Sequence, residues 1–255
     1  MARGPKSCAD ETETGRVSGF FDFLKTLPPY DDNANTVYRL EQRRRLIIEP
    51  FAPQIEGARV LDIAAHDGRW SYALAHAGAA EVVGVEARAE LVARFDAFPE
   101  TAFKPRVRLT CNDLYAEIEA RVSRGESFDM VAVYGIFYHI MDHFRLLSLI
   151  RRLAPRLIVI DSEFITLDNA MVQVLKEEVS NPLNAVSDVP GVTHTVVGVP
   201  SRRATGFMAE ALGYELSWVD HATLLGRDRR GMKDYFREGR KARFTCALTP
   251  AGAQA

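Results

Sequence analysis

The chain has few cysteines and no strong excess of charge. Only three cysteines occur among 255 residues, and Cys8, Cys111 and Cys246 are far apart with no paired spacing. This usage excludes a disulfide scaffold or a cysteine metal centre and is typical of reduced cytoplasmic thiols. No apolar run is long enough to span a bilayer. The polar segment 1–16 lacks the apolar core of a signal peptide, so we expect a cytoplasmic protein.

The charge balance also limits the kinds of partner. With 32 basic and 34 acidic residues the formal net charge is −2, so charge favours neither nucleic acid nor an anionic membrane. Hydrophobic residues make up 47% of the chain, which is enough for a sizeable core. The length fits one large α/β domain, or one domain with a small addition.

Apolar runs alternate with amphipathic segments from residue 59 onward. This alternation predicts a parallel sheet with helices on both faces. The predicted strands are 59–63, 81–86, 106–110, 128–134 and 156–161, followed by 214–219 and 244–248. The predicted helices are 69–77, 88–97, 114–123, 142–153 and 201–212. The expected fold is therefore α/β, a doubly wound and mostly parallel seven-stranded sheet.

Three segments are expected along the chain. Residues 1–16 form a disordered tail, residues 17–58 an N-terminal helical lid, and residues 59–255 the main domain. An insertion is expected near 165–200.

Inside these segments the pattern predicts further elements. The N-terminal addition should hold a short helix over 20–27 and a longer one over 36–51. The insertion should hold a helix over 168–180, followed by a long loop over 181–200 that is rich in Pro, Asn, Ser and Gly.

The segment from Val60 to Gly68 carries the strongest functional signal. An apolar run ends in Asp62, crosses a short turn and leads into a helix. Ligands of open α/β sheets bind at this end of a strand. Ala64 and Ala65 are small enough for a ligand to approach the backbone. The alternative is an ordinary strand-to-helix turn in a protein without a cofactor.

A second acid narrows the choice of ligand. Glu86 ends the next apolar run, where its carboxylate can accept both hydroxyls of a ribose. A dinucleotide site would favour three glycines around a diphosphate, but here those positions are Ala64, His66 and Gly68. Because His66 would crowd a diphosphate, the sequence favours a nucleoside cofactor without one and makes NAD a distant alternative.

These residues resemble the first motif of class I S-adenosylmethionine-dependent methyltransferases. That motif reads V-L-D-x-G-x-G-x-G, and the chain matches it at Val60-Leu61-Asp62 and at Gly68, while Ala64 and His66 replace the first two glycines. The resemblance covers about residues 60–161. It implies a Rossmann-like fold, S-adenosylmethionine as cofactor and S-adenosylhomocysteine as product.

The resemblance also implies roles for individual residues. Those on the methionine side are Asp62, Ala64, Ala65, His66 and Gly68. Those on the nucleoside side are Glu86 and Ala87 for the ribose, Asn112, Asp113 and Leu114 for the adenine, with Tyr134 facing the methyl donor. Asp113 can equally serve as the N-cap of the next helix.

The segment after residue 134 is the expected acceptor side. Residues 135–139 also resemble the G-x-x-Y-H segment of the tRNA wobble-uridine carboxymethyltransferases. Tyr138, His139 and His143 are candidates for proton transfer from the acceptor. The alternatives are that they pack and cap the next helix, or that alignment of the reactants is enough for catalysis.

The remaining candidates are substrate contacts. Arg39 and Arg43 could reach the methionine carboxylate from the helical lid, while Tyr138 and His194 could contact the acceptor. The alternative for the arginines is a solvated helix face. No metal is expected, because neither His143 nor His194 has a second ligand group at ligand spacing.

The sequence thus predicts methyl transfer to a small-molecule acceptor. Two basic stretches, 39–45 and 227–243, keep a tRNA-modifying enzyme as the alternative, although few aromatics are interleaved with the second one. A protein that binds S-adenosylmethionine without catalysis is a further alternative. The sequence leaves the oligomeric state open.

Overall fold

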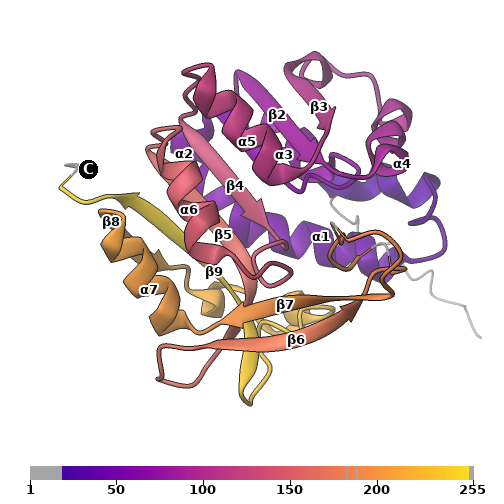
Figure 1. Cartoon of the computed structure of the whole chain (residues 1–255). Coiled ribbons are helices and arrows are strands. Elements are labelled where there is room, and N and C mark those ends of the chain that lie inside the picture. The colour runs from indigo at the N-terminus through magenta and orange to yellow at the C-terminus, as the bar shows by residue number, and fades with distance from the viewer. Residues whose placement is uncertain (1–18, 182, 188, 253–255) are drawn as a thin grey trace, which may run out of the picture.

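The computed structural model describes residues 19–181, 183–187 and 189–252, so the predicted tail 1–16 lies outside the described residues. A seven-stranded sheet has the order β3-β2-β1-β4-β5-β9-β8 (Figure 1). Its strands are β1 Arg59–Ile63, β2 Glu81–Glu86, β3 Val107–Cys111, β4 Met130–Tyr134, β5 Leu157–Ile165, β8 Tyr214–Trp218 and β9 Lys241–Pro250. The first five strands pair in parallel, and β9 pairs antiparallel with both β5 and β8. The predicted fold is confirmed.

Five helices follow the apolar pattern. They are α3 Arg69–His76, α4 Ala89–Val92, α5 Leu114–Ser123, α6 His143–Arg151 and α7 Arg202–Ala211. Two apolar clusters form. One contains residues of α3 and the N-terminal addition, and the other contains residues of α5, α6 and α7. The predicted helix 88–97 is shorter than expected, because a 3-10 helix replaces it over Ala93–Ala97. Every residue of β4 is buried, as expected for a central strand covered on both faces.

The N-terminal addition packs into the core of the domain. It contains a 3-10 helix Phe20–Thr26, helix α1 Ala34–Ile47, a 3-10 turn Glu49–Phe51 and the short helix α2 Ala52–Ile55. The side chain of Asn33 caps α1 by accepting from the Thr36 N–H. The apolar residues of this addition share a cluster with Val60 and Trp70. Both predicted helices therefore exist, and α1 ends before Pro50, which cannot continue a helix.

The insertion is a β-hairpin, so the helix predicted over 168–180 is wrong. β6 Val172–Glu178 pairs antiparallel with β7 His194–Pro200. β7 also replaces part of the loop predicted over 181–200. Valines recur along both strands and favour a pleated ladder, whereas the helix preference of the Leu-Lys-Glu-Glu run at 175–178 is weak.

The hairpin is attached to the domain at its base. The Gly198 N–H donates to the Ile140 carbonyl (2.9 Å), and a parallel bridge joins Ile165 to Ser201. Figure 1 shows the two strands lying across the lower end of the molecule, with the turn that joins them on the side of α1 and α4.

The end of the chain completes the sheet as predicted. Ser201 caps α7, and Gly213 follows the helix with φ +75°. The connection between β8 and β9 carries two 3-10 turns, His221–Thr223 and Gly226–Arg229. Within the described ranges, no helix is long and apolar enough to cross a membrane.

Candidate cofactor and acceptor site

The turn after β1 keeps the backbone shape of a glycine-rich loop with only one glycine. Ala64 and His66 both have φ +56°, and Gly68 has φ +80°. A residue with a Cβ in this left-handed region costs about 1–2 kcal/mol. The three glycine positions of the methyltransferase motif are therefore all left-handed here. At Gly68 a side chain is also excluded sterically, because a Cβ would lie 2.7 Å from Cδ2 of Phe95.

Glu86 connects this turn to the end of β2. Its Oε2 accepts from the His66 N–H (3.0 Å), and its Oε1 accepts from the Arg88 N–H (3.1 Å). Because β1 and β2 are parallel, with Ile63 paired to Val85, both turns lie at the same sheet edge. The structure therefore brings together the two motifs that pointed to a nucleoside.

Asp62 has an unusual environment at this edge. The residue is 1% exposed, and the Ser71 hydroxyl donates to its Oδ2 (2.6 Å). Its Oδ1 has no hydrogen-bond partner among the described residues. Burial raises the pKa of Asp62 to about 7. A buried carboxylate oxygen without a partner favours a cationic ligand group.

The N-terminal addition contacts the turn after β1 through Tyr30. The Tyr30 hydroxyl donates to Oδ2 of the fully buried Asp67 (2.5 Å), and Arg69 contacts both residues. Burial alone would raise the pKa of Asp67, but the Arg69 charge holds it well below its usual range. This contact was not predicted, because Tyr30 lies far from the motif along the chain.

The turn after β3 supplies the predicted adenine side. The Asn112 N–H donates to the Glu86 carbonyl (3.0 Å), which places this turn beside Glu86. Asp113 caps α5 by accepting from the Ala116 N–H (2.9 Å), which confirms the N-cap alternative. Ala87 and Asp113 are exposed and Leu114 is half-buried. Their adenine and ribose roles remain predictions.

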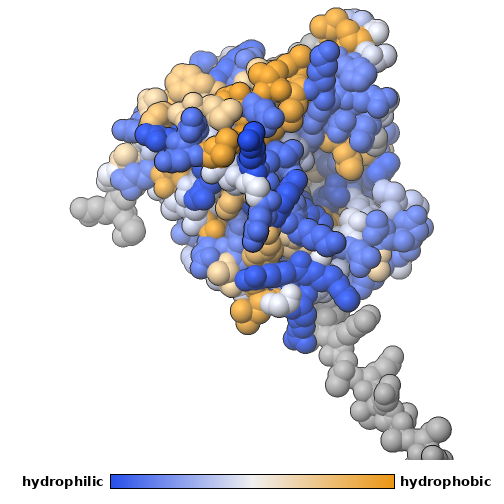
Figure 2. Space-filling model, turned by 90° about the horizontal axis from the view of Figure 1, so that it is seen from below, coloured by the Kyte–Doolittle hydropathy of each residue, from blue (hydrophilic) through white to orange (hydrophobic). Residues whose placement is uncertain are grey.

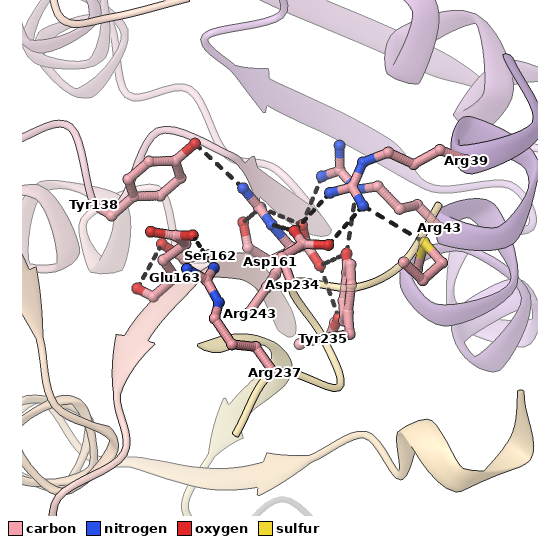
Figure 3. A network of polar contacts seen from close by, with 12 residues as sticks. Arg39, Arg43, Tyr138, Asp161, Ser162, Glu163, Asp234, Tyr235, Arg237 and Arg243 are labelled. Atoms are coloured by element: carbon pink, nitrogen blue, oxygen red, sulfur yellow. Dashed lines mark hydrogen bonds and ion pairs between the residues drawn. The ribbon is translucent and has the colours of Figure 1, made fainter. Parts of the chain in front are cut away.

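A buried charge network lies beside β4 (Figure 3). Asp161 of β5 is 0% exposed. Its Oδ1 accepts from Arg43 (2.6 Å) and Arg243 (2.8 Å), and its Oδ2 accepts from Tyr235 (2.5 Å) and Thr245 (2.9 Å). Burial would raise the pKa of Asp161, but the two guanidinium charges hold it well below its usual range.

Asp234 extends the same network. It accepts from Nη1 and Nη2 of Arg39, each at 2.6 Å, and from Nε of Arg243 at 3.0 Å. Arg39 and Arg43, predicted as contacts of the methionine carboxylate, are thus bound by carboxylates of the chain itself. The sequence missed this arrangement because it does not reveal that the β8–β9 connection returns to α1.

Tyr134 also binds α1. It is 6% exposed, and its hydroxyl donates to the Ile47 carbonyl (2.8 Å). Its ring meets Trp70 edge-on, with centroids 6.0 Å apart. Tyr134 thereby fixes the N-terminal addition against the end of β4, and its predicted cofactor contact remains a prediction.

Comparison with known proteins finds similarity over the first strands of the sheet. Residues 60–157 match the family model described as a methyltransferase domain. These residues are therefore similar to a methyltransferase domain. The match begins at the first residue of the motif and ends at the start of β5. It confirms the predicted enzyme class.

Solved structures similar to the methyltransferase domain confirm its predicted fold. The N-terminal domain of EvdMO1, solved with S-adenosylhomocysteine and D-fucose, is 19% identical over 84% of this chain and 82% of that one, with a TM-score of 0.59. An S-adenosylmethionine-dependent methyltransferase from Mesorhizobium loti is 15% identical over 85% of this chain and 99% of that one, with a TM-score of 0.51. Magnesium protoporphyrin IX methyltransferase from Synechocystis PCC 6803, with bound S-adenosylhomocysteine, is 12% identical over 84% of each chain, with a TM-score of 0.50. No curated protein sequence matches the chain.

The acceptor side of the methyltransferase domain brings two of its predicted residues together. The rings of Tyr138 and His139 lie 3.9 Å apart between centroids. Arg243 donates to the Tyr138 hydroxyl (3.2 Å), and Nδ1 of His139 lies 2.6 Å from Oε2 of Glu177. The sequence missed Glu177, because it assigned this segment to a helix.

The other two predicted histidines have different surroundings. Nε2 of the buried His143 lies 2.8 Å from the Phe137 carbonyl and 3.1 Å from that of Gly198. His143 therefore joins the turn after β4 to the hairpin, which is the packing alternative. His194 is exposed at the first residue of β7, beside the Thr193 hydroxyl. Their predicted roles in catalysis and acceptor binding remain predictions.

Replacement of Ala64 by glycine should stabilise the protein. Glycine adopts φ +56° without the Cβ penalty, so Ala64→Gly should raise the free energy of unfolding by about 1 kcal/mol. Urea denaturation measures the change. Ala116→Gly at an exposed position of α5 is the control and should lower it by about 0.5–1 kcal/mol. Equal losses of unfolding free energy in both variants would contradict the claim that the turn is strained at Ala64.

Replacement of Asp161 by asparagine should destabilise the protein strongly. The change leaves the buried Arg43 without its carboxylate and Arg243 with Asp234 alone, so Asp161→Asn should cost about 3–5 kcal/mol of unfolding free energy. Glu100→Gln, which breaks the exposed pair with Lys104, is the control and should cost much less. Thermal and urea unfolding compare the two. A small loss in Asp161→Asn would show that the network does not hold the domain together.

Proposed function

We propose that the methyltransferase domain transfers a methyl group from S-adenosylmethionine to a nucleophilic atom of a small-molecule acceptor. S-adenosylmethionine supplies a methyl group on a positively charged sulfur. The observation that carries the proposal is the turn 64–68 with Glu86. Its glycine positions stay left-handed although two of them have side chains, and its His66 N–H is bound by the acid that ends β2.

The residues at this edge fit the cofactor chemically. Asp62 would accept from the cationic amino group of the methionine part, which its unpaired Oδ1 suits. Glu86 would accept from the ribose hydroxyls, with Ala87 alongside. Asp113 and Leu114 would lie at the adenine, at the start of α5. Each carboxylate in this set would therefore have a donor on the cofactor.

His66 is compatible with a cationic cofactor. Burial lowers the pKa of His66 below its usual value of 6.5, so the ring is neutral at pH 7. A neutral ring adds no positive charge beside the sulfonium. The same ring would crowd a diphosphate, which supports a nucleoside cofactor over NAD.

The ion pairs of the basic residues favour a small acceptor over RNA. RNA binding depends on cations that are free to neutralise phosphates. In the two basic stretches, several arginines are instead paired with carboxylates of the chain: Arg39 with Asp234, Arg45 with Asp228, Arg237 with Glu163, and Arg243 with Asp161 and Asp234. On the face seen in Figure 2, hydrophobic residues interrupt the hydrophilic ones. The similar EvdMO1 domain was solved with a free sugar, D-fucose.

Removal of the ribose acid should abolish most cofactor affinity. Glu86→Ala removes the acceptor of both ribose hydroxyls and leaves the His66 N–H unpaired. We expect the dissociation constant of S-adenosylhomocysteine to rise about 10- to 100-fold, measured by calorimetric titration. Glu90→Gln, at an exposed position of α4, is the control and should bind as the wild type does. Equal affinity in all three proteins would refute the ribose role.

The acceptor class can be tested with labelled cofactor. Radioactive S-adenosylmethionine, labelled at the methyl group, should transfer label to members of a panel of hydroxylated small molecules and not to bulk tRNA. Label in tRNA would support the tRNA-modifying alternative. Binding of S-adenosylhomocysteine without transfer to either class would support a non-catalytic binding protein.

A further inference from the structure

We propose that Glu177, carried by the hairpin β6–β7, positions His139 as the base that takes the proton from the acceptor. The inference rests on the proposed function and deepens it, because it assigns the hairpin a part in the chemistry. Glu177 is a positioning residue, and His139 is the group that meets the acceptor.

The contact between the two side chains is short and sheltered. Nδ1 of His139 lies 2.6 Å from Oε2 of Glu177, with exposed side-chain fractions of 9% and 16%. A carboxylate only accepts hydrogen bonds, so Nδ1 carries the proton and Nε2 keeps its lone pair. Nε2 of His139 has no hydrogen-bond partner within the part of the chain that the structure describes. The pair therefore leaves the basic nitrogen of the ring available for an incoming proton.

The hairpin also contacts the cofactor side. Oε2 of Glu177 accepts a second hydrogen bond, from the Ala185 N–H (3.1 Å). The preceding residue, Asn184, accepts at its carbonyl from Nη2 of Arg88 (2.8 Å). The N–H of Arg88 in turn donates to Glu86. A continuous series of contacts thus joins the ribose acid to His139 through two adjacent residues between β6 and β7.

A hydroxyl acceptor would lose its proton as it gains the methyl group. The acceptor oxygen forms a bond to the methyl carbon while the carbon–sulfur bond breaks, and the electron pair of that bond stays on sulfur. The hydroxyl proton passes to Nε2 of His139. The resulting imidazolium is stabilised by the Glu177 carboxylate, as in other histidine bases oriented by an acid.

The surroundings of His139 suit a base near neutral pH. Burial lowers the pKa of His139 below its usual value of 6.5, and Arg243 of β9 acts in the same direction. Glu177 of β6 and Glu163 of β5 act in the opposite direction. The ring of Tyr138 packs against that of His139. The net lowering keeps His139 neutral at pH 7, the form that can accept a proton.

The first test uses the protein without cofactor. Nitrogen-15 NMR of labelled histidines reports which ring nitrogen carries the proton, and His139→Asn assigns the signal. At pH 8 the wild type should show the Nδ1–H tautomer, and Glu177→Ala should shift His139 toward Nε2–H, the form that free histidine prefers. A wild-type Nε2–H tautomer would overturn the proposal. This result does not depend on S-adenosylmethionine binding, so it stands apart from failure of the proposed function.

The second test separates positioning from a structural role. In Glu177→Ala, kcat should fall about 10- to 100-fold, part of what a base supplies, while KM for S-adenosylmethionine stays within about twofold. Glu177→Asp should recover part of the loss. The acidic limb of the rate profile should move to lower pH, because loss of the carboxylate lowers the pKa of His139.

The matched control is the neighbouring acid. Glu178→Gln changes an exposed carboxylate that accepts from the Ser180 hydroxyl (2.8 Å), and it should behave as the wild type does. If Glu177→Ala does not fold, Glu177→Gln, which keeps an acceptor for the Ala185 N–H, is tested in the same way. An unchanged kcat in Glu177→Ala, or equal losses of kcat in the Glu177 and Glu178 variants, would overturn the proposal.

Discussion

The buried carboxylate of Asp161 is the contact on which the arrangement of this molecule depends. It receives hydrogen bonds from Arg43 of α1, from Arg243 and Thr245 of β9, and from Tyr235 of the connection before β9. A lone buried charge is expensive, and a pair with complete hydrogen bonding is tolerated. One carboxylate therefore fixes the N-terminal addition and the end of the chain against the sheet, and through Arg243 it reaches Tyr138 on the acceptor side.

Strand geometry and a strained turn together form the sheet edge at which we propose that the cofactor binds. Parallel strands end at a common edge, so Asp62 and Glu86 meet there without any long-range signal in the sequence. Ala64 and His66 adopt glycine-like dihedral angles because the Ala65 N–H is bound by the Val85 carbonyl (2.8 Å) and the His66 N–H by Glu86. Strain of this kind persists where surrounding contacts impose it, and it is common at binding sites.

The sequence predicted what depends on local pattern and missed what depends on distant contacts. The apolar periodicity placed all seven strands of the main sheet, and the motif residues meet at one sheet edge, as expected. The helix predicted over 168–180 failed because Val172 and Val174 are stabilised by pairing with β7, which no local preference reports. The partners of Tyr30, Arg39 and His139 lie 37 or more residues away along the chain, so only the fold reveals them.

Hydrogen exchange with and without S-adenosylhomocysteine tests the central claim most directly, because it reports where the ligand binds. The account predicts slower exchange of backbone amides in residues 62–70 and 84–90, at the ends of β1 and β2. Slower exchange only elsewhere, with the ligand demonstrably bound, would contradict the assignment of the cofactor to this edge.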